Sequence, residues 1–507
     1  MRCTGKAQKR MRKIQTNSEN RHNQNQNDFI SRLPEDILLI ILNKLPMEDA
    51  VATSLLSSKW RDLWKLTSNV DFNYRWVQVR RKEIHPSVNH FVRSHHGKEI
   101  KCFSVSLRCR KSMVPDVQSW ITYAAKKNVE ELCINLNDRE DNRKNRTYHL
   151  HHLCFPACVL SFSSLVKLIL KFLWLDMDYF PHCESLKELH LEKLVLPNDE
   201  INGITEKSPA LQLLCLINCN LSENLHVNIS PNSNLRKLII EDEFVEYNRM
   251  QHIFLNAPKI TRIEFLSSMP KRKYHIVNMG VGIEARFNLN RMFRERGAAK
   301  ATCNGVLVRR YQQNLLGLLK TFQTAKVLEV CSWCIQVLSI LKVRQQEILL
   351  FEATHLVLNT GLNGWELPGI ALLLRACRKL ENLVIVMNDE AEELQFNDAF
   401  QRIYAFKQEF YWKNQGASST VCLQQLAVVE FRISHGDKFF RVTDNDIRDL
   451  ETWKNNSIEK QFFPEDTIQG YSAGAELLRF LRSKSVNLGK LIFTTKKQQF
   501  QICLKKI

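Results

Sequence analysis

The most informative segment of the chain reads SRLPEDILLIILNKLPMEDAVATSLLSSKWRDLWKL, residues 31–66. Pro34 and the two acidic residues after it suit the start of a helix, where negative charge is favoured. Pro46, also followed by acidic residues, predicts a second helix in the same way. Ser57 or Ser58 can cap a third helix that carries Trp60, Leu63 and Trp64 at helical spacing. The segment therefore predicts three short helices in close succession.

The first of these helices is apolar on every side, because residues 37–42 are six apolar residues in a row. Such a helix has to be covered all round. Three short helices can bury only one face against each other, so the remaining surface requires another domain or a partner protein. The alternative is an ordinary three-helix element packed against its own chain.

The segment resembles the F-box in the order and spacing of about 35 positions. Leu33-Pro34, Asp36-Ile37-Leu38 and Ile41-Leu42 match its first half, and residues 51–61 match its second half in the form common in plant proteins. This resemblance implies binding to the small adaptor subunit of a cullin-RING (SCF-type) ubiquitin ligase. The docking surface it implies consists of Leu33, Pro34, Ile37, Leu38, Ile41, Leu42, Leu45 and Trp60.

The chain has 507 residues, of which 44% are hydrophobic, enough for about three domains or for one domain and a long repeat array. No run approaches the ~18 apolar residues that a membrane span needs. The first residues, MRCTGKAQKRMRK, lack the apolar part of a secretory signal. We therefore expect an intracellular protein that contacts no membrane and keeps its 15 cysteines reduced.

The formal net charge of +19 is distributed unevenly. Residues 1–27 carry +6, residues 28–70 carry −1, and the rest of the chain carries +14. The tail is rich in Asn and Gln and is expected to be disordered. Its cluster Lys9-Arg10-Met11-Arg12-Lys13 is a candidate nuclear import signal, with a plain solvated tail as the alternative. The expected localisation is the nucleus, the cytoplasm or both, and the basic body favours acidic or phosphorylated partners.

A leucine-rich repeat pattern follows. Its template is met in full by sets that begin at Leu165, Leu186 and Leu211, and in shorter form at Leu235 and Ile260. These starts are 21, 25, 24 and 25 residues apart, within the range of roughly 20–29 known for such repeats. Weaker matches begin at residues 129, 325, 353 and 380. Each repeat contributes a short strand, and stacking buries a continuous core. The alternative is an ordinary α/β domain with leucine-rich strands.

Two stretches depart from the repeat pattern. Residues 266–324 contain many basic residues and a predicted helix from Val308 to Phe322, and represent either two degenerate repeats or an insertion. Residues 388–415 are charged and aromatic, and Phe400, Tyr404 and Tyr411 fit one helical face.

The C-terminal part of the chain has a different pattern. Residues 422–431 predict a strand, 475–481 a helix and 488–493 a strand. This C-terminal part resembles the FBD module of plant F-box proteins.

We find no pattern typical of catalysis or of a cofactor. Cys331 and Cys334 have the spacing of a metal or redox pair, but no second pair accompanies them. A second cluster has a spacing that fits no common zinc site; it consists of His149, His151, His152, Cys154 and Cys158. Glycine-rich phosphate loops are absent from the sequence, and so is a RING-like Cys/His array. We therefore expect no catalytic residues, no metal and no cofactor.

Together these patterns predict an α/β protein in which a three-helix F-box precedes a leucine-rich-repeat solenoid with an α/β cap. The predicted parts are a basic tail (1–27), the F-box (28–70), the solenoid (71–415) and an FBD-like cap (416–507). The expected function is a non-catalytic substrate-recognition subunit of a ubiquitin ligase, with an unknown protein substrate. The alternative is a repeat scaffold outside any ligase that contacts nucleic acid or acidic partners.

Overall fold

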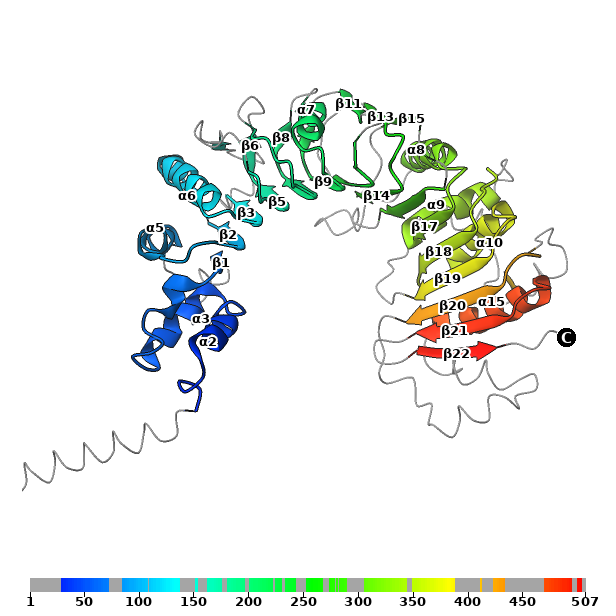
Figure 1. Ribbon diagram of the computed structural model, residues 1–507. Coiled ribbons are helices and arrows are strands. Elements are labelled where there is room, and N and C mark those ends of the chain that lie inside the picture. Colours follow the sequence, from blue (N-terminus) through cyan, green and yellow to red (C-terminus); the bar gives the residue numbers. More distant parts are fainter. Residues whose placement is uncertain are drawn as a thin grey trace, which may run out of the picture. The chain divides into compact units, whose positions relative to one another are not determined.

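The structure is a computed structural model of the 507-residue chain (Figure 1). The chain divides into two compact units, residues 1–188 and residues 189–507, which are described separately. The structure describes residues 29–72, 84–107, 109–136, 151–153, 162–175, 180–196, 200–221, 224–229, 233–242, 252–267, 273–278, 280, 282–289, 305–343, 349–387, 411–412, 423–433, 469–494 and 499–503. The basic tail, most of residues 388–415 and the segment 434–468 lie outside them.

The first unit begins with an N-terminal helical element, which we define as residues 29–66. Its helices are α2 (Glu35–Leu42), α3 (Met47–Ala52) and the short 3-10 turns η1 (Thr53–Leu55) and η2 (Leu63–Leu66). Pro34 and Pro46 directly precede α2 and α3, as predicted. The prediction of a third α-helix is wrong. The backbone nitrogen of Trp60 bonds to Ser57 and that of Lys65 to Asp62, so this stretch closes three-residue turns instead.

The rest of the first unit is a parallel sheet with helical connections. Its elements are β1 (Asn69–Phe72), α5 (Ile84–Ser94), β2 (Cys102–Ser106), η3 (Lys111–Met113), α6 (Val114–Lys126), β3 (Glu131–Asn135), β4 (His151–Leu153), β5 (Lys167–Lys171) and β6 (Leu173–Leu175). Strands β1, β2, β3 and β5 pair in that order, and β4 pairs with β6. The helices α5 and α6 lie on the same side of β1 to β3 (Figure 1).

The second unit continues the alternation of strands and connections. Its elements are β7 (Glu188–Glu192, which starts at the boundary), β8 (Val195–Leu196), α7 (Glu200–Lys207), β9 (Leu213–Ile217), β10 (Asn220–Leu221), β11 (Asn224–Asn228), β12 (Lys237–Asp242), β13 (His252–Asn256), β14 (Arg262–Ser267), β15 (Lys273–Val277), β16 (Glu284–Asn288), α8 (Gly305–Thr321), β17 (Val327–Cys331), α9 (Ser332–Val343), β18 (His355–Thr360), η7 (Gly364–Glu366), α10 (Leu367–Ala376), β19 (Asn382–Met387), β20 (Val428–Ile433), α15 (Gln469–Lys484), β21 (Lys490–Thr494) and β22 (Gln499–Cys503).

Three sets of paired strands organise this unit. The main sheet runs in the order β7-β9-β12-β14-β16-β17-β18-β19-β20-β21-β22, and its last strand, β22, is antiparallel to β21. A smaller sheet has the order β11-β13-β15, and β8 pairs with β10. The predicted repeats supply β9, β12, β14, β17, β18 and β19. Strand β20, helix α15 and strand β21 form the α/β cap at the C-terminal end.

The leucine-rich template predicted the buried side of the repeat strands that it identified. Leu214 and Leu216 are buried on β9, and Leu356 and Leu358 are buried on β18, while their neighbours along each strand are mostly more exposed. In the irregular stretch 266–324, β16 and helix α8 continue the array. The template missed β16 because Ala285 and Phe287 occupy the buried positions in place of leucine. It also missed β1 and β2, so repeat strands begin directly after the N-terminal helical element.

One face of the main sheet in the second unit carries the helices. The described helices α8, α9, α10 and α15 lie on the same side of strands β16 to β21 (Figure 1). We call the opposite side, formed by the alternate residues of β9 to β22 that point away from these helices, the open face. A doubly wound sheet would carry helices on both sides. The arrangement is therefore that of a leucine-rich-repeat solenoid and not of an ordinary α/β domain. Among the described residues, no helix combines the length and the apolar character that a membrane crossing requires.

Candidate functional site

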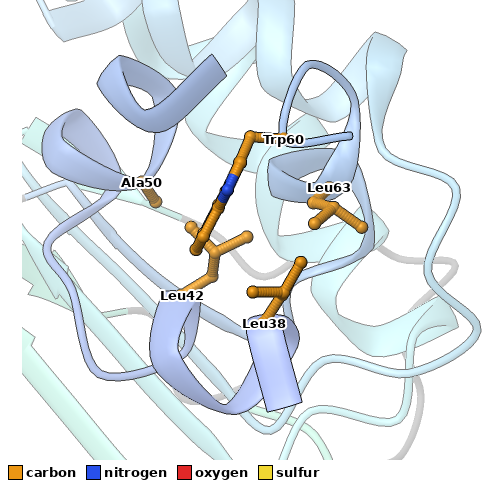
Figure 2. Packing of buried hydrophobic residues seen from close by; sticks show 5 residues of the cluster. All are labelled: Leu38, Leu42, Ala50, Trp60 and Leu63. Carbon is orange, nitrogen blue, oxygen red and sulfur yellow. The ribbon is translucent and has the colours of Figure 1, made fainter. Parts of the chain in front are cut away.

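The N-terminal helical element is built around a small apolar core (Figure 2). Leu38 and Leu42 of α2 point into it, together with Ala50 of α3, Trp60 and Leu63, and each of these side chains is at most 5% exposed. Leu33, Leu39 and Leu45 pack around this core and are partly buried. The five central side chains come from all parts of the element, so this core holds α2 against α3 and the turns that follow.

Polar contacts fix the position of Trp60 in this core. Its indole Nε1 donates a hydrogen bond to Ser31 Oγ at 3.0 Å, and Ser31 Oγ also lies 3.0 Å from Ser57 Oγ. Nearby, Lys59 Nζ donates to the carbonyl oxygen of Leu33 at 2.6 Å. The segment before α2 is therefore bound to the turn that carries Trp60, and the indole nitrogen has a partner although it is buried.

The outer face of α2 is apolar as well. Ile37, Ile40 and Ile41 follow each other at the spacing of one helical face, and their side chains are 41%, 54% and 36% exposed. A second apolar group follows on α3 and η1, where Leu55 is 88% exposed and Leu56 is 62% exposed. We call Ile37, Ile40, Ile41, Val51, Leu55 and Leu56 the exposed apolar surface of this element.

This surface is unusual within the molecule. Twelve large apolar side chains of the described residues are exposed, and nine of them lie between residues 29 and 66. Only Val277, Leu350 and Val486 lie elsewhere in the described chain. Exposed apolar side chains that concentrate in one small region mark an interaction site. The element therefore has a folded core of its own and an additional apolar surface that this core does not use.

A buried polar network joins the end of this element to the first helices of the sheet. His95 Nε2 lies 3.0 Å from the carbonyl oxygen of Thr67, and Tyr123 Oη lies 2.5 Å from His95 Nδ1. Burial lowers the pKa of His95 to about 4, against the opposing effect of its bond to Thr67. The imidazole is thus neutral at physiological pH, with Nε2–H donating to Thr67 and Nδ1 accepting from Tyr123.

Comparison with known proteins agrees with this geometry. The F-box domain model matches residues 30–70. Residues 30–70 are an F-box, and leucine-rich repeats follow it. The model of the repeats of FBD-associated F-box protein At5g56370 matches residues 117–283. The matched F-box segment ends within β1, and α5, β2, α6 and β3 follow it in the first unit.

Several Arabidopsis thaliana proteins are similar to the chain. F-box/LRR-repeat protein At3g03360 is 26% identical over 71% of this chain and 70% of its own length. Putative F-box/LRR-repeat protein At3g28410 is 29% identical over 71% of this chain and 70% of its own length. F-box/FBD/LRR-repeat protein At1g13570 is 29% identical over 46% of this chain and 53% of its own length. The chain thus resembles plant F-box proteins with leucine-rich repeats, including one with an FBD module.

The structure separates the eight docking residues predicted from the F-box resemblance into two groups. Pro34, Ile37 and Ile41 are exposed. Leu38, Leu42 and Trp60 are at most 2% exposed, and Leu33 and Leu45 pack partly against them. The prediction is therefore corrected for Leu38, Leu42 and Trp60, which are core residues because the turn carrying Trp60 folds back onto α2. These three residues pack in the core beneath the exposed apolar surface and are not part of that surface.

The sequence prediction omitted four residues of the exposed apolar surface: Ile40, Val51, Leu55 and Leu56. Ile40 was detectable, because it lies three residues after Ile37 and so shares its helical face. The other three were not distinguishable from core residues by periodicity, because α3 is short and passes directly into η1. Their exposure became visible only in the folded F-box.

The structure describes the first cysteine-containing candidate completely and the second only in part. Cys331 and Cys334 are buried at the junction of β17 and α9, with their sulfur atoms 3.5 Å apart. Within the described residues, no group of three or more His, Cys, Asp or Glu side chains is placed to hold a metal ion. Of the second cluster, His151 and His152 lie on β4, while His149, Cys154 and Cys158 lie outside the described residues.

Proposed function

We propose that the chain is the substrate-recognition subunit of an SCF-type cullin-RING ubiquitin ligase. In this proposal the F-box binds the small adaptor subunit, and the repeats hold a protein substrate. The single observation that supports it most is the concentration of exposed apolar side chains in the F-box, over a core that is already complete.

The proposed mechanism is proximity, and the chain contributes no chemistry of its own. The adaptor connects the F-box to the cullin, and the complex supplies a ubiquitin-loaded enzyme. Holding the substrate near that enzyme turns an encounter between two molecules into a reaction within one complex, which raises the effective concentration of the substrate lysine. Burial of the exposed apolar surface would contribute several kcal/mol to adaptor binding after association costs, on the order expected from its area.

The double variant Ile37→Asp/Ile41→Asp tests the docking surface. Both side chains are exposed, so the F-box core stays intact, while two charges enter the proposed interface. We expect adaptor affinity, measured by calorimetry on the purified full chain, to fall roughly 100-fold, which corresponds to about 2.7 kcal/mol. The matched control is Val277→Asp/Val486→Asp, since these valines are 55% and 79% exposed outside the F-box. Equal adaptor binding by both double variants and the wild type would refute the proposal.

Salt dependence separates this function from the alternative, a repeat scaffold that binds nucleic acid. Binding to phosphates weakens steeply as ionic strength rises, because counterions are released. Adaptor binding through apolar side chains should change little over the same range. Binding of RNA or DNA oligonucleotides that is strong at low salt and lost at moderate salt, without any adaptor binding, would favour the scaffold.

We also propose that the protein acts in the nucleus, the cytoplasm or both. The basic cluster from Lys9 to Lys13 supports nuclear import but lies outside the described residues. A fluorescent fusion of the full chain, compared with a variant whose basic residues in this cluster are replaced by alanine, measures the effect directly. Unchanged nuclear signal in the variant would exclude this cluster as the import signal.

A further inference from the structure

The charged side chains of the open face form a connected cluster on strands β12, β14, β16 and β17. Glu264 lies at its centre, 3.3 Å from Lys237 and 2.5 Å from Arg262, with Arg286 at 3.9 Å. Arg286 in turn lies 3.1 Å from Glu329. Burial alone would raise the pKa of Glu264, but the hydrogen bond and charge of Arg262, together with Lys237, lower it overall. The basic groups of this cluster are thus engaged with carboxylates of the same face.

The face as a whole is electrically balanced. From β9 to β22 its outward positions carry five basic and five acidic side chains, namely Lys237, Arg262, Arg286, Arg432 and Lys490, and Glu241, Glu264, Glu284, Glu329 and Glu430. The chain as a whole has a formal charge of +19, so its positive excess lies elsewhere. The expectation of an acidic or phosphorylated substrate, drawn from that net charge, does not apply to the open face.

Beside this cluster lies a patch of valines. Val357 on β18 is directly opposite Val384 on β19, and Val386 follows two residues later on the same strand. All three are outward-facing and partly exposed. We call Val357, Val384 and Val386 the valine patch.

Polar groups that are already bonded surround the valine patch. Asn359 donates to Glu329 at 3.0 Å, and the Asn382 amide lies 3.0 Å from His355 Nε2. On the other side, Glu430 accepts two hydrogen bonds from Arg432, which holds the pKa of that carboxyl below its usual range. An apolar centre with a polar, internally bonded rim is the common anatomy of a protein interface.

The backbone of this region offers no docking edge. Strand β18 pairs with β17 and β19, and β19 pairs with β18 and β20. A ligand therefore cannot add a strand here and has to be recognised by side chains. The apolar side chains available for this at the centre of the region are the three valines.

We propose that the valine patch anchors an uncharged, apolar segment of the substrate protein. The proposal rests on the proposed function for the identity of the ligand as a ligase substrate, and it adds the chemical class of the segment recognised. An anionic ligand is disfavoured here, because Arg286 and Arg432 would have to leave their carboxylates and the anion would face Glu329 and Glu430. An apolar side chain needs none of these bonds to break.

Selection of peptides by the purified full chain tests the proposal. The probe is a phage-displayed library of random twelve-residue peptides, followed by titration of the enriched sequences as synthetic peptides. We expect enriched peptides to share uncharged apolar residues, and Val384→Asp to weaken their binding at least tenfold. The isosteric variant Val384→Thr, which keeps the shape of the side chain, should weaken it less but in the same direction.

Val277→Asp is the matched control, because Val277 is exposed on β15 of the smaller sheet and not on the open face. It should bind the enriched peptides like the wild type. Three results would overturn the proposal: enrichment of acidic peptides, no enrichment above background, or equal binding by the wild type and both Val384 variants.

The same variants and peptides distinguish a failure of this inference from a failure of the proposed function. The variant Ile37→Asp/Ile41→Asp should lose the adaptor and still select the same peptides, because its changes are confined to the F-box. Peptide selection without any adaptor binding by the wild type would refute the ligase function and leave the valine patch as a binding site. Adaptor binding without selection of apolar peptides would refute only the valine patch.

Discussion

Asn69 at the start of β1 donates two hydrogen bonds to Asn43 at the end of α2. Asn43 Oδ1 accepts from the backbone nitrogen of Asn69 at 3.2 Å, and Asn69 Nδ2 donates to the carbonyl oxygen of Asn43 at 2.8 Å. Asn43 Oδ1 also accepts from the backbone nitrogen of Ser68 at 2.9 Å. The contacts satisfy backbone groups at a helix end and at a strand start, and they join the F-box to the first strand of the repeat sheet.

Replacing Asn43 tests this junction. In Asn43→Ala the backbone nitrogens of Ser68 and Asn69 lose their acceptor, at a cost of about 1–3 kcal/mol for partly buried groups. We expect faster hydrogen exchange of these two amides, measured by mass spectrometry of peptides that cover residues 66–72. Asn43→Asp is the control, since it keeps an acceptor oxygen in place. Equal exchange in Asn43→Ala and the wild type would show that these bonds do not hold the junction.

Truncation of two neighbouring residues of α2 should destabilise the F-box to very different extents. Leu42 is fully buried and Ile41 is 36% exposed. Leu42→Ala removes core packing and should destabilise the F-box by about 2–5 kcal/mol, whereas Ile41→Ala should cost less than about 1 kcal/mol. Denaturant unfolding, followed by hydrogen exchange within residues 35–66, measures both. Similar losses in the two variants would contradict the assignment of Leu42 to the core and of Ile41 to the surface.

Helices α9 and α10 pack closely where Gly369 lies against the carbonyl of Ile335. A Cβ atom at Gly369 would collide with that oxygen, and the Gly369 nitrogen already donates to Ser339 Oγ at 2.7 Å. Gly369→Ala should therefore lower the melting temperature, as expected from an overpacking cost of about 1–3 kcal/mol. Gly317→Ala on α8 is the matched control, because nothing lies within 4 Å of the added atom. It should be neutral or stabilise the helix by up to about 1 kcal/mol, and equal effects of the two changes would argue against this close packing.

Acidification should loosen the connection between the F-box and α5. Burial lowers the pKa of His95 to about 4, from 6.5 for the free side chain. Between these values the unfolded chain binds the proton more readily, so stability falls as the pH drops from about 6.5 towards 4. We expect the midpoint of unfolding to decrease over this range and the decrease to be smaller in His95→Gln. The same slope in both proteins would show that His95 does not titrate in this way.

The sequence alone was sufficient for the starts of α2 and α3 and for the buried side of the repeat strands that the template identified. Pro34 and Pro46 marked the starts of α2 and α3, because proline and acidic residues suit a helix N-terminus. Leucines at alternate positions marked the repeat strands, since a strand buries every second residue. Strand β16 also buries every second residue, but Ala285 and Phe287 occupy those positions in place of leucine. The leucine template therefore did not identify this strand.

Only the tertiary structure determined which apolar side chains are available to a partner and which charges are free. Residues 37–42 are all apolar, so no polar residue marks the outer face of α2. The packing of Trp60 against Leu42 determines which face of the helix is buried. On the open face, Lys237, Glu264 and Arg286 lie on three neighbouring strands, and only the parallel register brings them together. Net charge is a sum over the chain, whereas recognition depends on which charges already have partners, and folding alone sets that.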